Sequence, residues 1–144
     1  MINWIEGHGN AFDFKCLVNH DLDFSSIGEF YVSDEVFYEM VDFCPKDKPS
    51  CKLYESKEIR KVFEKYSNEK YAKNWKTPML VIHGGNDFRL PITEGLSTFT
   101  SFQLKGIESR FLYLPMENHW VLNPANQLKW YEEVLIWLDK HTQA

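Results

Sequence analysis

The stretch VIHGGNDFRLPITEG, from Val81 to Gly95, changes its pattern halfway along and decides the fold. It continues the apolar run PMLVIHG at 78–84, which is typical of a strand buried on both faces. ITEGLSTFTSFQLKG at 92–106 then has the apolar spacing of a helix that a glycine ends. Between them two adjacent glycines permit a sharp turn, which leaves Asp87 at the end of the strand. The stretch therefore predicts a strand, a turn and a helix.

The same order recurs towards the end of the chain. SRFLYLP at 109–115 predicts a second strand, and NPANQLKWYEEVLIWLDKH at 123–141 predicts a helix with Asn123 as N-cap and Pro124 in its first turn. Upstream, FKCLVNH at 14–20 is a short apolar run that reads as another buried strand. Apolar strands that alternate with helices indicate βαβ units. We predict an α/β fold of about three parallel strands flanked by helices.

The other segments predict further helices at Met1 to about Gly7, in a short stretch from Val36, and at Lys57 to Lys73. Apolar spacing also predicts which side of the two main helices packs on the sheet. For 92–106 these residues are Ile92, Leu96, Phe99 and Leu104, and for 123–141 they are Leu128, Tyr131, Val134, Leu135 and Leu138.

Composition excludes several classes of protein. The 144 residues are 44% hydrophobic and 16% aromatic, enough for one domain with a packed core. The net charge is −5 and no basic run occurs, so we expect no nucleic acid partner. Nothing approaches a membrane span of about 20 apolar residues, so we expect no membrane insertion.

The first residues do not resemble a signal peptide, and the compartment stays open. Cys44 and Cys51 form a disulfide or stay free thiols with about equal expectation.

The residues best placed for chemistry follow the ends of two predicted strands. Asp87 follows the strand at 78–84, and His119 lies in the segment MENHW that follows the strand at 109–115. Neighbouring strands are roughly 5 Å apart, so the carboxylate can reach the imidazole. The carboxylate would then fix the ring tautomer, and the other ring nitrogen would act as a general base toward a nucleophile.

Each residue alone has a plainer interpretation. An aspartate after two glycines is more often a turn residue that caps its own backbone, and a histidine after a strand is more often a hydrogen-bonded loop residue. The order of the two loops favours the catalytic interpretation, because Asp87 and then His119 matches the order Ser…Asp/Glu…His of α/β-hydrolases.

Other candidates are weaker. The segment HDLD at 20–23 could suggest a metal through His20, Asp21 and Asp23, but it is a common loop composition, and we predict no metal and no cofactor. His83 is expected to be structural, and Arg89 to pair with a carboxylate that supports the acidic loop. Gly84 and Gly85 are not expected to hold a phosphate, because no G-x-G-x-x-G and no P-loop lysine follows them.

Two motifs carry a family resemblance. The D-x-R-x-P segment from Asp87 to Pro91 and the ENHW segment from Glu117 to Trp120 resemble the last part of the catalytic domain of the prolyl oligopeptidase family of serine peptidases. The nearest branch holds acylaminoacyl-peptidases and fungal dipeptidyl-peptidase V, and the resemblance covers essentially the whole chain. It implies an α/β-hydrolase fold, with Asp87 and His119 as acid and base of a triad. It also implies short peptide substrates that are cleaved near their N-terminus.

The chain lacks the nucleophile motif that the resemblance implies. The family has a G-x-S-x-G-G-Y elbow just before the segment that here begins MINW, and this chain contains no G-x-S-x-G. Cys16 lies within a predicted strand and offers no substitute. We therefore expect residues 1–144 to be a partial catalytic domain that lacks the first strands and the elbow. Met1 would then be an internal methionine of a longer protein or the start of a truncated gene copy.

Two consequences are expected for such a chain. It should have negligible peptidase activity alone, and the open apolar edge of the strand at 14–20 should favour self-association. One alternative is a non-catalytic binding or regulatory module derived from such a peptidase. Another is a complete small esterase with an unrecognised nucleophile.

Overall fold

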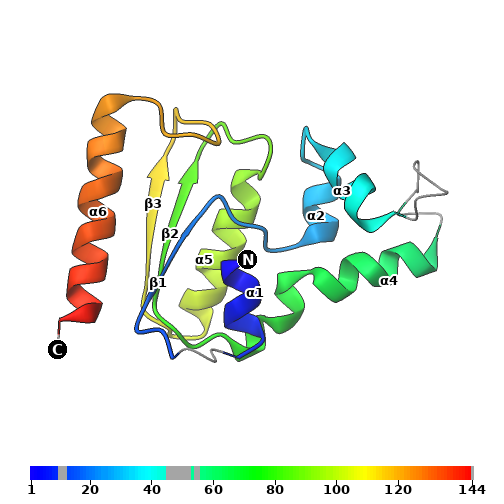
Figure 1. Ribbon diagram of the computed structural model, residues 1–144, viewed down its shortest axis with the longest axis horizontal. Coiled ribbons are helices and arrows are strands. Elements are labelled where there is room, and N and C mark those ends of the chain that lie inside the picture. The colour runs from blue at the N-terminus through cyan, green and yellow to red at the C-terminus, as the bar shows by residue number, and fades with distance from the viewer. Residues whose placement is uncertain (10–12, 45–52, 54–55, 144) are drawn as a thin grey trace.

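The computed structural model describes residues 1–9, 13–44, 53 and 56–143 (Figure 1). Three parallel strands form its sheet: β1 (Leu17–His20), β2 (Met79–Gly84) and β3 (Ser109–Leu114), in the order β1-β2-β3. The three strands confirm the predicted parallel sheet, although β1 is shorter than the predicted strand at 14–20. Because β1 pairs only with β2 among the described strands, self-association through its other edge stays a prediction.

Helices cover both faces of the sheet. The long helix α6 (Pro124–Thr142) lies on one face, and α5 (Ile92–Leu104) and α1 (Ile2–Gly7) lie on the other (Figure 1). Successive side chains of a strand point to opposite faces, so β2 serves both layers. Its fully buried core residues alternate between the two sides. Met79 and Val81 pack in the α5 layer, and Leu80 and Ile82 pack in the α6 layer.

The predicted contact side of α6 is wrong. The helix packs on the sheet through Trp130, Val134 and Trp137, and the Trp137 indole donates a hydrogen bond to Leu17 O at 3.1 Å. Of the predicted residues only Val134 packs there, and the rest are exposed: Leu128 73%, Tyr131 61%, Leu135 63% and Leu138 38%. The helix has two apolar stripes, and the one with Trp130 and Trp137 packs on the sheet. Its large side chains fill the layer, and the indole of Trp137 has a carbonyl oxygen as hydrogen-bond acceptor.

The predicted side of α5 is correct only in part. Of the predicted residues Phe99 packs against the core, whereas Leu96 and Leu104 are 46% and 83% exposed. Phe102, which was not predicted, is fully buried there. The helix ends at Leu104, just before the predicted stop at Gly106, whose φ of +68° is a left-handed conformation that glycine adopts without strain.

A second group of helices lies beside the sheet. The helices α2 (Ser26–Phe30), α3 (Val36–Phe43) and α4 (Lys57–Tyr66) share an apolar cluster of their own, centred on the fully buried Phe63 (Figure 1). The two alternatives for Cys44 and Cys51, a disulfide or free thiols, concern position 51, which lies outside the described residues. Among the described helices, none is long and apolar enough to cross a membrane.

The predicted helix at 57–73 is two elements. After α4 the chain continues as the 3-10 helix η1 (Asn68–Asn74). The break has a tertiary cause, because Asn68 Nδ2 donates to the backbone oxygen and to Oδ2 of Asp23, each at 3.0 Å. The two hydrogen bonds tie the start of η1 to the loop before α2, and the chain between α4 and η1 is extended at Ser67, with a ψ of 121°.

Four carboxyl groups meet between this second group of helices and α5. Burial, and then repulsion from neighbouring carboxylates, raise the pKa of Asp23 to about 6, of Glu29 to about 9 and of Glu39 to about 7. Burial also raises the pKa of Glu94, although Glu94 Oε2 accepts backbone hydrogen bonds from Phe24 and Ser25 at 2.9 and 2.7 Å. The folded chain therefore holds protons that an unfolded chain would release.

We expect the folded chain to lose stability as the pH rises from about 7 to about 9. The folded pKa of Glu29 is raised, so its stabilising protonation is complete below the unfolded pKa and is lost as the pH rises through about 9. One such group costs at most about 1.4 kcal/mol per pH unit, so Tm should fall by several degrees. Thermal melts should show a flatter pH dependence in Glu29→Gln, while Asp42→Asn, on the exposed side of α3, should keep the wild-type slope. Equal slopes in all three proteins would contradict this expectation.

Candidate active site

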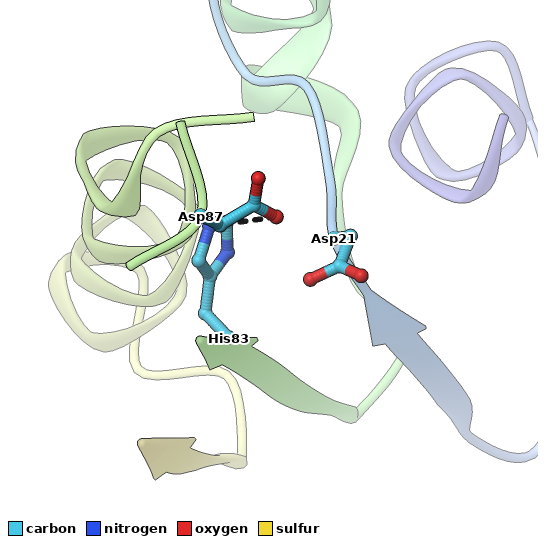
Figure 2. A group of neighbouring side chains, drawn as sticks. All are labelled: Asp21, His83 and Asp87. Carbon is cyan, nitrogen blue, oxygen red and sulfur yellow. Dashed lines mark ion pairs between the residues drawn. The ribbon is translucent and has the colours of Figure 1, made fainter. Parts of the chain in front are cut away.

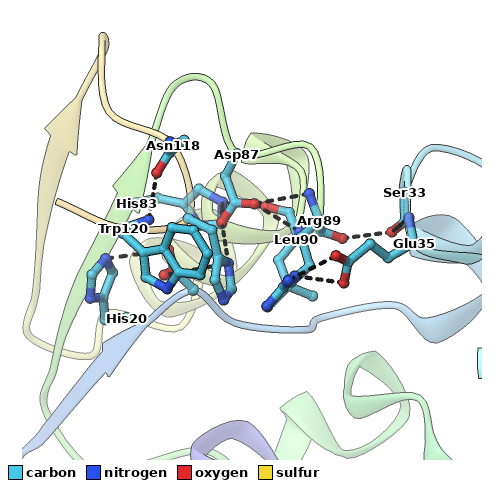
Figure 3. Close-up of polar contacts among 11 residues, drawn as sticks. His20, Ser33, Glu35, His83, Asp87, Arg89, Leu90, Asn118 and Trp120 are labelled. Carbon is cyan, nitrogen blue, oxygen red and sulfur yellow. Dashed lines mark hydrogen bonds and ion pairs between the residues drawn. The ribbon is translucent and has the colours of Figure 1, made fainter. Parts of the chain in front are cut away.

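Three loops meet where the parallel strands end. The first follows β1, which ends at His20, and carries Asp21. The second follows β2 and carries Asp87 (Figure 3), and the third follows β3 and carries His119. Because all three strands run in the same direction, their carboxyl ends lie at one edge of the sheet. The structure brings Asp87 and His119 together as predicted, and it adds Asp21.

Gly84 and Gly85 allow the second and third loops to touch. A Cβ atom at Gly84 would lie 2.3 Å from Asn118 O, and one at Gly85 would lie 2.4 Å from Pro115 O. The Gly85 N–H donates to Leu114 O at 2.9 Å, so the two loops are also joined by hydrogen bonding. The glycines therefore serve the close approach of two backbones, which sets the position of one loop against the other.

The carboxylate of Asp87 serves two partners at once. Its Oδ1 accepts the backbone N–H groups of Arg89 and Leu90, each at 3.0 Å. Its Oδ2 lies 2.9 Å from His119 Nδ1, which donates because a carboxylate only accepts. Asp87 is 3% exposed, so both sets of contacts are shielded from water. Asp87 therefore caps its own turn through Oδ1 and contacts His119 through Oδ2.

The loop that carries His119 is anchored by one of its own carboxylates. Glu117, two residues earlier, is 4% exposed and accepts hydrogen bonds from the Leu122 N–H at 2.7 Å and from the side-chain amide of Asn126. These hydrogen bonds, led by that from Asn126, hold the pKa of Glu117 below its ordinary value. The anchored carboxylate ties the loop to the first turn of α6.

The second ring nitrogen of His119 is free for chemistry. No described residue hydrogen-bonds Nε2, and the side chain is 25% exposed. Two cavities of about 460 Å³ each border the imidazole. One is lined by aromatic side chains that include Trp130 and Tyr131, and the other by acidic side chains that include Glu29 and Glu39. The His119 side chain therefore lies next to both cavities.

Arg89 and His83 have the structural roles that were predicted. The Arg89 guanidinium pairs with Glu35, with Nη2 at 2.8 Å from Oε1 and Nε at 2.6 Å from Oε2 (Figure 3). The Ser33 hydroxyl donates to Arg89 O at 2.8 Å, so the start of α3 supports the acidic loop. His83 is fully buried and donates from Nε2 to Leu90 O at 2.6 Å, and burial lowers its pKa.

The segment at 20–23 does not gather its side chains around one point. Asp23 faces Ser26 and Asn68, away from Asp21. Asp21 instead lies beside His83 and Asp87, with one donor or acceptor atom of each within 4.8 Å of the others (Figure 2). His83 Nε2 and Asp87 Oδ1 are already hydrogen-bonded to backbone groups. We therefore assign no metal to this group, and the absence of a metal stays a prediction.

The serine and cysteine side chains of the described residues do not hydrogen-bond His119. Several are committed elsewhere, since Ser25 caps α2, Ser33 bonds Arg89 O and Ser101 bonds Ser97 O. Burial raises the pKa of the Cys16 thiol, which disfavours the reactive thiolate.

Sequence comparisons place these features among known proteins. The sequence model of the prolyl oligopeptidase family matches residues 1–144. Dipeptidyl-peptidase 5 of Schizosaccharomyces pombe is 38% identical over 143 residues, which cover 99% of this chain and 20% of that protein. Dipeptidyl-peptidase 5 of Trichophyton equinum is 42% identical, over 97% of this chain and 18% of that protein. The chain therefore spans about a fifth of the length of the curated relatives it matches.

Solved structures agree on the fold. The acylaminoacyl peptidase of Pyrococcus horikoshii superposes with a TM-score of 0.77 at 22% identity, over 96% of this chain and 22% of that chain. A puromycin-hydrolyzing peptidase of Mycobacterium tuberculosis gives 0.75 at 13% identity, over 99% of this chain and 21% of that chain. These neighbours are α/β-hydrolase peptidases, which confirms the predicted fold class.

Proposed function

Because the chain belongs to the prolyl oligopeptidase family, we propose that it supplies the acid and the base of a serine-peptidase triad. Asp87 is the acid and His119 is the base. The observation that carries the proposal is the 2.9 Å contact between Asp87 Oδ2 and His119 Nδ1, on loops that follow neighbouring parallel strands. The free Nε2 then faces the site that a nucleophile would occupy.

In the proposed reaction, His119 Nε2 takes the proton of a serine hydroxyl as its oxygen attacks the carbonyl carbon of a peptide bond. The imidazolium then protonates the leaving amine, and the acyl group remains on the serine until water releases it. Asp87 keeps the proton on Nδ1 and stabilises the imidazolium while it exists. The chain contains no G-x-S-x-G, so the serine is proposed to come from polypeptide outside residues 1–144.

The proposed substrates are short peptides that are cleaved near their N-terminus. The support is the names of the relatives, which are dipeptidyl-peptidases, together with the acylaminoacyl peptidase among the structural neighbours. A partial catalytic domain agrees with a match to only 18–20% of those relatives.

A chimera tests the proposal. Residues 1–144 replace the matching segment of the S. pombe dipeptidyl-peptidase 5, which keeps its own nucleophile region, and hydrolysis of a fluorogenic dipeptide is measured. We expect turnover that a serine-directed phosphonate blocks, and no turnover from the 144-residue chain alone. The unaltered relative serves as the positive control, and gel filtration and circular dichroism establish that the chimera is folded.

Two outcomes would contradict the proposal. A folded chimera without turnover would favour the alternative of a non-catalytic binding module, which the exposed apolar stripe of α6 at Leu128, Tyr131 and Leu135 also suits. Robust, phosphonate-sensitive turnover by the 144-residue chain alone would show that it holds its own nucleophile.

A further inference from the structure

Asp21 occupies the end of β1 in an uncommon backbone conformation. Its φ is +52°, in the left-handed region that aspartate enters more easily than most residues but still at a cost. Its backbone N–H donates to Ile82 O at 3.3 Å, which ties the residue to β2. The backbone therefore fixes the direction of the Cα–Cβ bond of Asp21.

That direction is towards the pair of Asp87 and His119. The Asp21 side chain is 10% exposed and lies next to Asp87 (Figure 2). Its Oδ2 is 3.6 Å from His119 Nδ1, the nitrogen that Asp87 Oδ2 contacts at 2.9 Å. Two carboxyl groups, from the loops that follow two different strands, thus lie near one ring nitrogen.

The surroundings keep a proton on Asp21. Burial, and then the charge of Asp87, raise the pKa of Asp21 to about 8, although Arg89 acts in the opposite direction. The two other histidines nearby do not neutralise it, because burial lowers the pKa of His20 to about 4 and also lowers that of His83. At neutral pH Asp21 is therefore a hydrogen-bond donor beside a carboxylate, and above about pH 8 it becomes a second negative charge.

We propose that Asp21 is a positioning residue for His119, and that its carboxyl group fixes the Nδ1 side of the imidazole together with Asp87. The proposal rests on the proposed function, because positioning matters for catalysis only if His119 is the base. It requires that the electronic surroundings of the His119 ring change when Asp21 ionises.

Nuclear magnetic resonance of the 144-residue chain can detect this change in the surroundings of the His119 ring directly. In ¹⁵N-labelled protein, the ring nitrogen shifts of His119 are followed by long-range ¹H–¹⁵N spectra from about pH 5 to about pH 10. We expect a step near pH 8 that disappears in Asp21→Asn. The matched control is Asp13→Asn, because Asp13 is exposed and has a similar φ of +50°. For this experiment the N-terminus of the protein is acetylated, because Met1 borders the same cavity as Asp21 and a free amine would add a second charge there.

The outcomes are decisive in both directions. A His119 step near pH 8 that is lost only in Asp21→Asn supports the proposal. No step in the wild-type chain, or a step that persists in folded Asp21→Asn, overturns it. If Asp21→Asn does not fold, the ¹³C carboxyl shift of Asp21 in the wild type decides, because it must titrate together with the His119 ring.

Turnover separates this proposal from the proposed function. In the chimera, Asp21→Asn should lower kcat about 10- to 100-fold with KM unchanged, as expected for a base held slightly out of place. A chimera that is inactive while the wild-type chain shows the Asp21-dependent step would remove the peptidase function but keep the interaction. A fully active Asp21→Asn chimera would overturn the positioning role alone.

Discussion

Replacing His119 with alanine in the chimera is expected to lower kcat by about 10⁴- to 10⁶-fold, with little change in folding. Among the described residues, the His119 imidazole alone contacts Asp87 Oδ2 at 2.9 Å and keeps a second ring nitrogen without a hydrogen bond. Without it, nothing takes the proton from the attacking hydroxyl or returns one to the leaving amine. Steady-state hydrolysis of the fluorogenic dipeptide measures the effect.

Matched substitutions give this prediction its control. His8→Ala removes another exposed imidazole, at the end of α1, and should leave kcat unchanged. Asp87→Asn should lose about 10⁴-fold, because two backbone N–H groups hold the amide oxygen at the Oδ1 position and turn the NH₂ group toward His119 Nδ1. That contact demands the wrong tautomer. A His119→Ala chimera with near-normal kcat would rule out the proposed base.

The features that the sequence predicts well are local. The apolar run that becomes β2, the two glycines and Asp87 lie within ten residues, so periodicity and turn chemistry suffice to place them. The pair of Asp87 and His119 follows from one further step, because consecutive βαβ strands are usually neighbours in the sheet. The structure confirms both.

The features that the sequence missed depend on distant contacts. Asp21 could have been found by the rule that located Asp87 and His119, since it also follows a predicted strand. Its importance depends on β1 pairing with β2, whose partners Leu17 and Met79 are far apart in sequence. The contact side of α6 depends likewise on the sheet that receives it, because both of its apolar stripes have helical spacing.

The second large effect is expected from Gly84→Ala. The added methyl group would lie 2.3 Å from Asn118 O and 2.7 Å from Glu117 O, and both atoms belong to the backbone of the loop that carries His119. Backbone cannot rotate away as a side chain can, so one loop must move. Overpacking of this kind costs about 1–3 kcal/mol in the free energy of unfolding. A displacement of about 1 Å between Asp87 and His119 would lower kcat about 100-fold.

Gly28, which has more space around it, provides the control for the expected losses in unfolding free energy and in kcat. At Gly28, in α2, an added Cβ meets side-chain atoms and no backbone, with Ser25 Cβ and Oγ at 3.3 Å and Glu94 Oε1 at 3.7 Å. Alanine also favours the helix more than glycine does. Gly28→Ala should therefore keep both the unfolding free energy and kcat near wild type, while Gly84→Ala lowers both. Urea unfolding of the 144-residue chain and dipeptide hydrolysis by the chimera provide the two readouts. A Gly84→Ala protein that matches Gly28→Ala in both would mean that the contact between the two loops does not set the geometry of the pair.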